Sequence, residues 1–357
     1  MIGKVIKIHS DFYYVNLNNN ILECKIREKL KKEKIEIFVG DLVKIEKTPS
    51  NSKQAAIIEV LPRNNYLPRP SISNVDQVLI VAALTQSKLE FEQLNRYLCQ
   101  AKLYDIPAFI CINKSDLDET LSFKQKILDI YTNIGYKVIF TSALSGFGID
   151  ELINTLESKV TVLCGMSGVG KTSLLNKIHP ELKLKTKEIS AKTNKGTHTT
   201  RHVEILEVPC LNKKTLQVAD TPGFSYLKFD TVMPSIINEL FDEIKEFSSE
   251  CYFSDCLHLN EEGCNVLANV SKIDSTRYGS YKTFVREAVE YKEKIRKEGH
   301  KEEKSSKSVD TGNKEMKQLI KLGTQARKKS RNTEKQKMNL ISILDEVYYN
   351  QNQEDFD

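Results

Sequence analysis

The chain has 357 residues, of which 40% are hydrophobic and 28% are charged, and its formal net charge is +5 at pH 7. This composition is typical of a globular protein with two or three domains, and eight cysteines are too few for a disulfide scaffold. The longest apolar run, around "VDQVLIVAAL", is too short to cross a bilayer, and the start lacks a signal-peptide profile. We therefore expect a reducing, cytoplasmic setting.

Residues 1–68 predict a small all-β barrel. The segments "GKVIKIHS", "FYYVNLN", "ILECKIR" and "GDLVKIEKT" have strand character and are separated by turn residues. Five or so short strands in this length are typical of an oligonucleotide-binding (OB) fold. Twelve basic and eight acidic residues, with aromatic residues at 12–14, make it a candidate RNA-binding surface. A purely structural barrel is the alternative.

Residues 69–228 predict an α/β domain. Apolar strands within "VDQVLIVAAL", "PAFICINKSD", "KVIFTSALSG" and "VTVLC" alternate with segments of helical periodicity. Such alternation is typical of a parallel sheet with helical crossovers, which binds ligands at the carboxyl ends of its strands.

The remainder predicts helices followed by a tail. Strands are expected to cease after "DTPGFSYL", and residues 229–299 are expected to form a helical domain. Residues 300–357 are rich in Lys, Glu and Ser, and we expect a disordered, charged tail. Its basic stretch, residues 317–337, suits a polyanionic partner, or is simply solvated.

A phosphate-binding loop lies in "CGMSGVGKTS". It satisfies the G-x-x-x-x-G-K-[ST] pattern between a predicted strand and a predicted helix. Glycines let backbone amides face phosphates, Lys171 supplies positive charge, and the Thr172 hydroxyl is a magnesium ligand. The predicted phosphate-binding residues are Gly165, Met166, Ser167, Gly168, Val169, Gly170, Lys171, Thr172 and Ser173.

Two later segments predict switch regions. Asp220 in "DTPG" can hold the magnesium shell, and the Gly223 amide can meet a γ-phosphate. In "NKGTHTTRHVEI", Thr200, or less favourably Thr199, can ligate magnesium only when a γ-phosphate is present. Alone, both segments also read as ordinary turns; their order and spacing after the phosphate loop favour the switch interpretation.

The tetrapeptide "NKSD" predicts guanine recognition. The carboxylate of Asp116 can accept from guanine N1–H and N2–H, Asn113 can brace the loop, and the Lys114 stem can lie over the base. "TSALSG" would then present the Ala143 amide to guanine O6. The predicted guanine-binding residues are Asn113, Lys114, Ser115, Asp116, Ser142 and Ala143. In isolation the tetrapeptide also fits a helix-capping turn.

The order of these motifs is unusual because both guanine segments precede the phosphate loop. A parallel sheet tolerates such a circular permutation if the old termini are close and the new ones open in a surface connection. The second switch then leads directly into the C-terminal domain, so nucleotide state can be transmitted there.

With "NVDQ", "GMSGVGKTSLLN", "GTHTTRH" and "DTPGF", residues 1 to about 295 resemble the RsgA (YjeQ/YloQ) family of circularly permuted GTPases. The resemblance implies an OB barrel, a permuted P-loop GTPase domain and a C-terminal zinc domain. It implies binding of GTP/GDP and of the small (30S) ribosomal subunit and its rRNA, with subunit-stimulated hydrolysis late in maturation. We expect a monomer without a membrane partner. Met166 in place of a common Gln, and a longer tail, depart from the family pattern.

A metal site is predicted at Cys251, Cys256, His258 and Cys264. Three thiolates and one imidazole complete a tetrahedral zinc shell with no open position, which indicates a structural role. The spacing is unusual by general zinc rules but matches the family motif ligand for ligand. A disulfide with a spare thiol is the alternative, which a reducing cell disfavours.

The catalytic group is not evident, because Phe224 stands where many GTPases place a water-orienting Gln. His198 is our candidate, which the family resemblance also implies, and His202 is a weaker one. Alternatively, the ribosome supplies this group. Two other functions compete: an RNA-binding protein with a vestigial nucleotide site, which intact Lys171, Thr172 and Asp220 argue against, and a GTP switch for a membrane or signalling partner.

Overall fold

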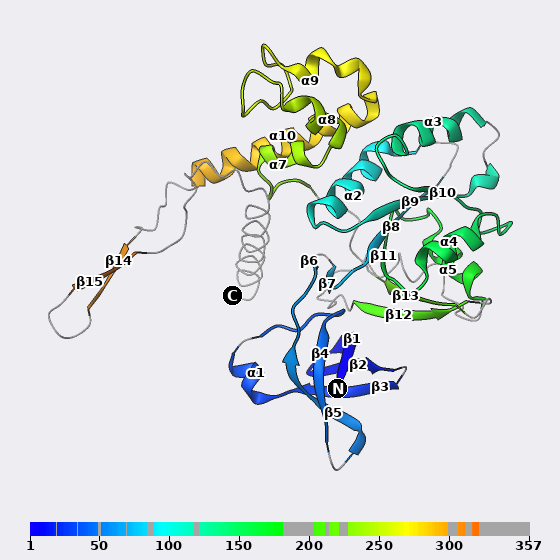
Figure 1. Ribbon diagram of the computed structural model, residues 1–357, viewed down its shortest axis with the longest axis vertical. Coiled ribbons are helices and arrows are strands. Elements are labelled where there is room, and N and C mark those ends of the chain that lie inside the picture. The colour runs from blue at the N-terminus through cyan, green and yellow to red at the C-terminus, as the bar shows by residue number, and fades with distance from the viewer. Residues whose placement is uncertain are drawn as a thin grey trace. The chain divides into compact units, whose positions relative to one another are not determined.

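The computed structural model describes residues 1–18, 20–33, 35–48, 51–68, 70–83, 89–117, 121–180, 203–210, 214–220, 228–298, 306–310 and 316–320 (Figure 1). The chain divides into two compact units, Met1–Leu227 with Asn238–Thr283, and Lys228–Ile237 with Phe284–Asp357. The domain boundaries at residues 68, 228 and 299 stay predictions. Within the described ranges, no helix is long and apolar enough to cross a membrane.

Five strands form an N-terminal barrel: β1 (Ile2–His9), β2 (Phe12–Leu17), β3 (Asn20–Ile26), β4 (Leu42–Thr48) and β5 (Asn51–Val60). Their order is β1-β2-β3-β5-β4, and β1 also pairs with β4, which closes the barrel. β3 and β5 run parallel, whereas the other neighbours are antiparallel. Val5, Val15 and Ile57 are fully buried inside it. A short helix, α1 (Glu28–Lys32), was not predicted, and its Leu30 packs into this core. The predicted OB-type barrel is confirmed.

A buried carboxylate joins the barrel to the segment that follows it. Asp41 is fully buried and accepts hydrogen bonds from Arg63 at 2.7 and 2.9 Å and from Ser73 Oγ at 2.6 Å. Ser73 ends a small hairpin made by β6 (Tyr66–Pro68) and β7 (Ser71–Ser73). The charge of Asp41 is therefore paired and hydrogen-bonded, as a buried charge requires.

The second sheet has the order β10-β9-β8-β11-β13-β12. Its strands are β8 (Gln77–Ala83), β9 (Ala108–Asn113), β10 (Val138–Phe140), β11 (Val160–Cys164), β12 (Glu204–Pro209) and β13 (Thr215–Asp220). Helices α2 (Phe91–Leu103), α3 (Leu121–Tyr131), α4 (Ile149–Leu156) and α5 (Lys171–Ile178) accompany it. Alternate residues of β8 enter different cores: Val78 and Ile80 pack with α2 and α3, and Leu79 and Val81 with α4 and α5. Helices therefore cover both faces, as the near-continuous apolar strands predicted.

One edge of this sheet differs from the wholly parallel arrangement that we expected. β12 runs antiparallel to β13, which follows it closely in the sequence. β12 also pairs with barrel strand β1 at Lys7↔Glu204, where the two side chains form a 2.9 Å ion pair. The barrel and the α/β sheet thus form one 11-stranded sheet.

The C-terminal segment contains α7 (Pro234–Glu239), α8 (Asp242–Ser248), α9 (Asn265–Ala268) and α10 (Ser275–Glu298). The continuous helical periodicity of residues 235–247 predicts one helix, but the structure has two, α7 and α8, because the chain is extended at buried Phe241 between them. The expectation that strands cease after residue 227 is wrong at β14 (Ser306–Asp310) and β15 (Met316–Ile320), whereas the disordered, charged tail expected over residues 300–357 stays a prediction. The two strands form an antiparallel hairpin, which needs only backbone pairing between near neighbours in sequence.

Candidate nucleotide site and metal cluster

The phosphate loop lies between β11 and α5, as predicted. The Lys171 ammonium reaches back over the loop and donates to the carbonyl oxygens of Gly165, at 2.6 Å, and Met166, at 2.8 Å. Thr172, in the first turn of α5, is buried. A lysine held over a loop at a helix N-terminus places positive charge where a phosphate would bind.

Two glycines of this loop occupy positions where a side chain would be strained. Gly165 has φ +137°, and a Cβ there would lie 2.1 Å from the carbonyl oxygen of Val81. Gly170 has φ +95°, and its Cβ would lie 2.3 Å from Asn113 Nδ2. Both positions require the left-handed backbone that glycine adopts and the close approach that its missing side chain allows.

Asn113 connects the phosphate loop with both guanine segments. It ends β9, is buried, and its Nδ2 donates to the Val169 carbonyl oxygen at 2.9 Å. Its Oδ1 accepts from the Ala143 backbone N–H at 3.2 Å and from Thr141 Oγ1 at 3.3 Å. Loops that lie 30 and 56 residues from Asn113 in the chain therefore meet at one side chain. The Ala143 amide, which we expected to face guanine O6, here serves this brace.

The acidic residue of the tetrapeptide is positioned by the second guanine segment. Ser142 Oγ donates to Asp116 Oδ1, and the Ser115 backbone N–H donates to the Thr141 carbonyl at 3.0 Å. Lys114, which lies between Asn113 and Ser115, has φ +61°, and this left-handed conformation turns the chain sharply. Ser142 and Ser115 are buried, whereas Asp116 is exposed. The Asp116 carboxylate is thus oriented by the Ser142 hydroxyl but remains exposed, so it can accept hydrogen bonds from a ligand.

The switch residues are placed only in part. Asp220 is the last residue of β13, and its backbone pairs with Glu204. The other predicted switch positions lie outside the described residues; these are His198, Thr199, Thr200, His202, Gly223 and Phe224.

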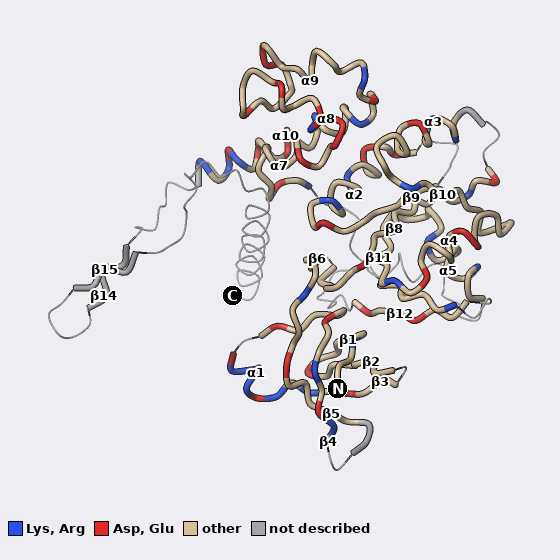
Figure 2. The backbone as a smooth tube through the Cα atoms, viewed as in Figure 1, with Lys and Arg blue, Asp and Glu red and all other residues tan. Residues whose placement is uncertain are grey.

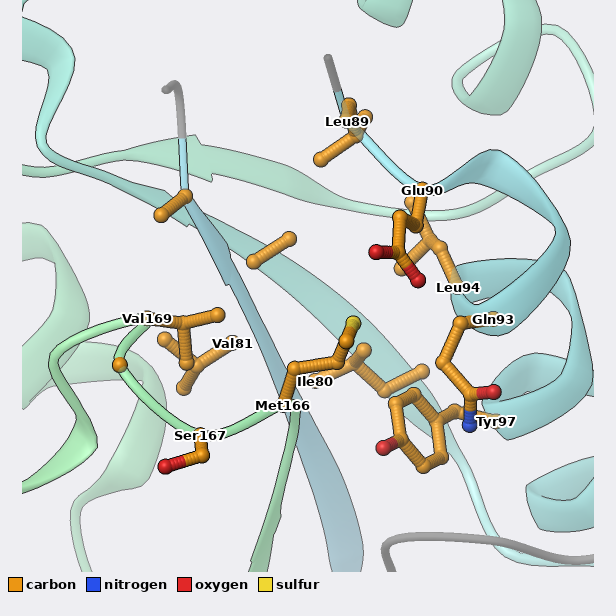
Figure 3. Close-up of a pocket in the computed structure, with 13 residues that line it drawn as sticks. Ile80, Val81, Leu89, Glu90, Gln93, Leu94, Tyr97, Met166, Ser167 and Val169 are labelled. Carbon is orange, nitrogen blue, oxygen red and sulfur yellow. The ribbon is translucent and has the colours of Figure 1, made fainter. Parts of the chain in front are cut away.

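A cavity of about 200 Å³ lies beside the phosphate loop, which the sequence did not reveal (Figure 3). Its walls are the end of β8, the start of α2 and residues 166–169. Met166 projects from the loop toward α2, where Gln93 and Tyr97 line the opposite wall (Figure 3). Burial raises the pKa of Tyr97 to about 12, so its hydroxyl stays protonated. The Met166 side chain therefore contributes apolar wall to this cavity.

The four predicted metal ligands lie together. The ligand atoms of Cys251, Cys256, His258 and Cys264 are all within 4.8 Å of one another. His258 Nδ1 lies 3.5 Å from Cys251 Sγ and 3.4 Å from Cys264 Sγ, while Nε2 lies 3.2 Å from Asn238 Nδ2. All four cysteine and histidine side chains are thus aimed at one point, and none of the cysteines is in a disulfide. Three soft sulfur donors with one imidazole form a set that fits zinc.

Hydrogen bonds between Glu261 and the backbone hold the loop that carries this cluster. Glu261 accepts hydrogen bonds from the backbone N–H groups of Leu257, Leu259 and Asn260 at 2.8–3.0 Å. Burial would raise the pKa of Glu261, but these bonds bring it below its ordinary value. Burial also raises the pKa of the Cys256 thiol to about 12. A metal ion would have to displace the thiol proton in order to bind the sulfur, so metal binding would release protons.

A second buried polar cluster connects α10 with α2. Arg277 is 1% exposed; its Nε donates to Glu243 at 2.6 Å and its Nη1 to Asn95 Oδ1 at 3.0 Å. Asn95 is fully buried, also accepts from Tyr131 Oη at 3.0 Å, and donates to Ser280 Oγ at 2.8 Å. This cluster ties α10 to the helix that lines the cavity beside the phosphate loop. The sequence offered no signal for it.

Family models and relatives agree on what this arrangement is. The RsgA GTPase model matches residues 60–230, and the RsgA N-terminal domain model matches residues 2–57. A model for 50S ribosome-binding GTPases matches residues 160–309, beginning at the strand before the phosphate loop.

Relatives named small ribosomal subunit biogenesis GTPase RsgA match most of this chain, and two of them serve as examples. The one from Caldanaerobacter subterraneus is 39% identical over 296 residues, covering 82% of this chain and 97% of its own, and the one from Bacillus velezensis is 41% identical over 297 residues, covering 81% and 98%. YjeQ from Thermotoga maritima has a TM-score of 0.68 at 32% identity, covering 81% of this chain and 98% of its own. YloQ, described as a circularly permuted GTPase, has a TM-score of 0.66 at 34% identity, covering 81% and 95%. The chain belongs to the RsgA family of circularly permuted GTPases.

Proposed function

We propose that this protein hydrolyses GTP to GDP and phosphate in a pocket formed by residues 113–116, 142–143 and 165–173. The observation that supports this most is the Asn113 side chain, which binds both the phosphate loop and the Ala143 segment. Asp116 supplies the carboxylate that reads guanine, and Lys171 the charge that binds phosphates. Adenine lacks the paired donors that Asp116 would accept, so the pocket selects guanine.

Magnesium would be held by Thr172 and Asp220 and, when a γ-phosphate is present, by Thr200. When bound there, the ion would supply positive charge that offsets the negative charge of the phosphates during transfer to water. Thr172 already stands in the first turn of the helix that follows the phosphate loop. We propose that Gly223 binds the γ-phosphate through its amide and that His198 orients the attacking water.

The target of this activity would be the small ribosomal subunit, late in its maturation, as the names of the relatives suggest. The barrel would contact rRNA, since exposed Lys29, Lys31 and Lys32 on α1 favour a polyanion. We propose that the protein acts as a monomer in the cytoplasm of a bacterium or in the matrix of an organelle derived from one.

Purified small subunits are expected to accelerate GTP hydrolysis, because Phe224 cannot orient water as a glutamine does. His198→Ala should lower the subunit-stimulated rate of hydrolysis by about 10²-fold or more, while GTP affinity stays within about threefold of wild type. Phosphate release with and without subunits measures the basal and the accelerated rates of hydrolysis. His179→Ala, outside the proposed pocket, is the matched control. No acceleration would contradict the ribosomal role. Unchanged turnover in His198→Ala would eliminate His198 alone.

Zinc removal is expected to unfold the loop that carries the cluster. We propose one structural zinc ion per chain, and the residues between Cys251 and Cys264 are too polar to pack without it. Cys256→Ser should therefore abolish bound zinc and expose this loop to protease, while GTP affinity stays near wild type. Zinc content and limited proteolysis measure this, with Cys210→Ser, a buried thiol elsewhere, as control. Full zinc occupancy in Cys256→Ser would contradict the assignment.

A further inference from the structure

Two adjacent aromatic side chains in the metal-binding loop face solvent. Tyr252 is 81% exposed and Phe253 is 48% exposed, and their rings meet edge to face with centroids 4.9 Å apart. Burying either ring would remove its apolar area from water, which normally stabilises a folded protein. Two large aromatic residues left outside the core therefore mark an interaction site rather than a packing element.

The backbone holds this pair in place. The Tyr252 N–H donates to the Gly263 carbonyl at 3.2 Å, and the Phe253 carbonyl accepts from the Cys256 N–H at 3.3 Å. Gly263 has φ +72°, and a Cβ there would lie 3.0 Å from the Tyr252 Cβ. Cys251 and Cys256, both members of the metal cluster, flank the pair. Rigid aromatic anchors lose little entropy when they bind, which is typical of binding hot spots.

The surrounding charge indicates which partner fits. From Glu246 to Ser271, all of it described, the chain contains five acidic residues and no Lys or Arg (Figure 2). Asp255 and Glu262, close to the aromatic pair in sequence, are exposed. Carboxylates around an exposed aromatic pair repel the phosphates of RNA, but attract guanidinium groups, which also stack on aromatic rings.

We propose that Tyr252 and Phe253 dock onto an arginine-rich surface of a protein component of the small subunit, and not onto its rRNA. This inference rests on the proposed function. It gives the protein two contacts with the small subunit, one basic and one acidic. The basic α1 of the barrel suits RNA, whereas the acidic, aromatic loop suits a basic protein.

Two double variants of the full-length, zinc-loaded protein test the proposal. Tyr252→Ser with Phe253→Ser removes the anchors, and Asp255→Lys with Glu262→Lys reverses the local charge. All four side chains are exposed, so folding should be retained, which zinc content checks. Ile295→Ser, and Glu290→Lys with Glu293→Lys, make matched changes at exposed positions of α10. Affinity is measured for intact small subunits by cosedimentation, and for protein-free small-subunit rRNA.

We expect each double variant of the loop to bind small subunits at least about tenfold more weakly than wild type, since central aromatic anchors carry much of an interface's affinity. Binding to protein-free rRNA should not change, and the α10 controls should behave as wild type. Unchanged subunit binding by both loop variants would overturn this inference but not the proposed function. Tighter binding after charge reversal would also overturn it, because RNA would then be the partner. If wild-type protein does not bind subunits, the proposed function fails and this inference with it.

Discussion

Asp116→Asn is expected to exchange guanine selectivity for xanthine selectivity. The Asp116 carboxylate accepts two hydrogen bonds from guanine, whereas an amide offers one acceptor and one donor. Its NH₂ would face the guanine amino group, so the bond from that group is lost and two donors oppose each other. At 1.5–3 kcal/mol for a hydrogen bond to a charged group, GTP affinity falls by about 10²-fold. Xanthine has a carbonyl where guanine has that amino group, so XTP should bind the variant more tightly than GTP does.

This exchange can be measured by competition of GTP and XTP for a fluorescent nucleotide. Because Ser142 Oγ donates to Asp116 Oδ1, and an asparagine oxygen accepts the same bond, the loop should keep its shape. Asp129→Asn, at an exposed position of α3, is the matched control and should leave both affinities unchanged. Retained GTP preference in Asp116→Asn would show that this carboxylate does not read the base.

Arg277→Ala is expected to lower the free energy of unfolding by about 3–5 kcal/mol, the range for breaking a buried ion pair on one side. The substitution leaves the Glu243 carboxylate, 12% exposed, without its 2.6 Å partner. It also removes a donor from buried Asn95 and a guanidinium from the Phe241 ring, whose centroid lies 4.5 Å away. The loss is therefore one of electrostatics, hydrogen bonding and packing together.

Urea unfolding followed by far-ultraviolet circular dichroism measures this loss, since the chain contains no tryptophan. Arg286→Ala changes an exposed arginine of the same helix and should stay within about 0.5 kcal/mol of wild type. Glu243→Gln with Arg277→Met, which removes both charges, should be more stable than Arg277→Ala alone. Equal unfolding of Arg277→Ala and Arg286→Ala would contradict the structural role of this cluster.

Much of the fold could be predicted because it follows from local periodicity. Continuous apolar strands alternating with amphipathic helices indicated the α/β sheet, and β8 feeds alternate residues into two cores as such strands must. The errors lie where tertiary contacts override local pattern. Buried Phe241 separates α7 from α8 within one apolar stretch, and β12 is antiparallel because its partner follows directly in the chain.

The nucleotide site was readable because its chemistry is carried by short motifs whose loops the sheet must bring to one edge. The structure places Asn113, Asp116 and Lys171 accordingly, although their role in binding GTP stays a proposal. The Arg277–Asn95 contact could not be predicted, since it joins residues 182 apart that read as ordinary helix positions. The cavity beside Met166 likewise depends on how α2 sits against the phosphate loop, which no local pattern encodes.

The central claim is that loops far apart in this permuted chain form a single pocket that selects guanine and binds its triphosphate. Isothermal titration of the wild-type protein with GTP and with ATP, both with magnesium, tests it most directly. We predict that GTP binds at least about 10²-fold more tightly, from two charge-assisted hydrogen bonds that adenine cannot make. Equal affinity for the two nucleotides would contradict the account.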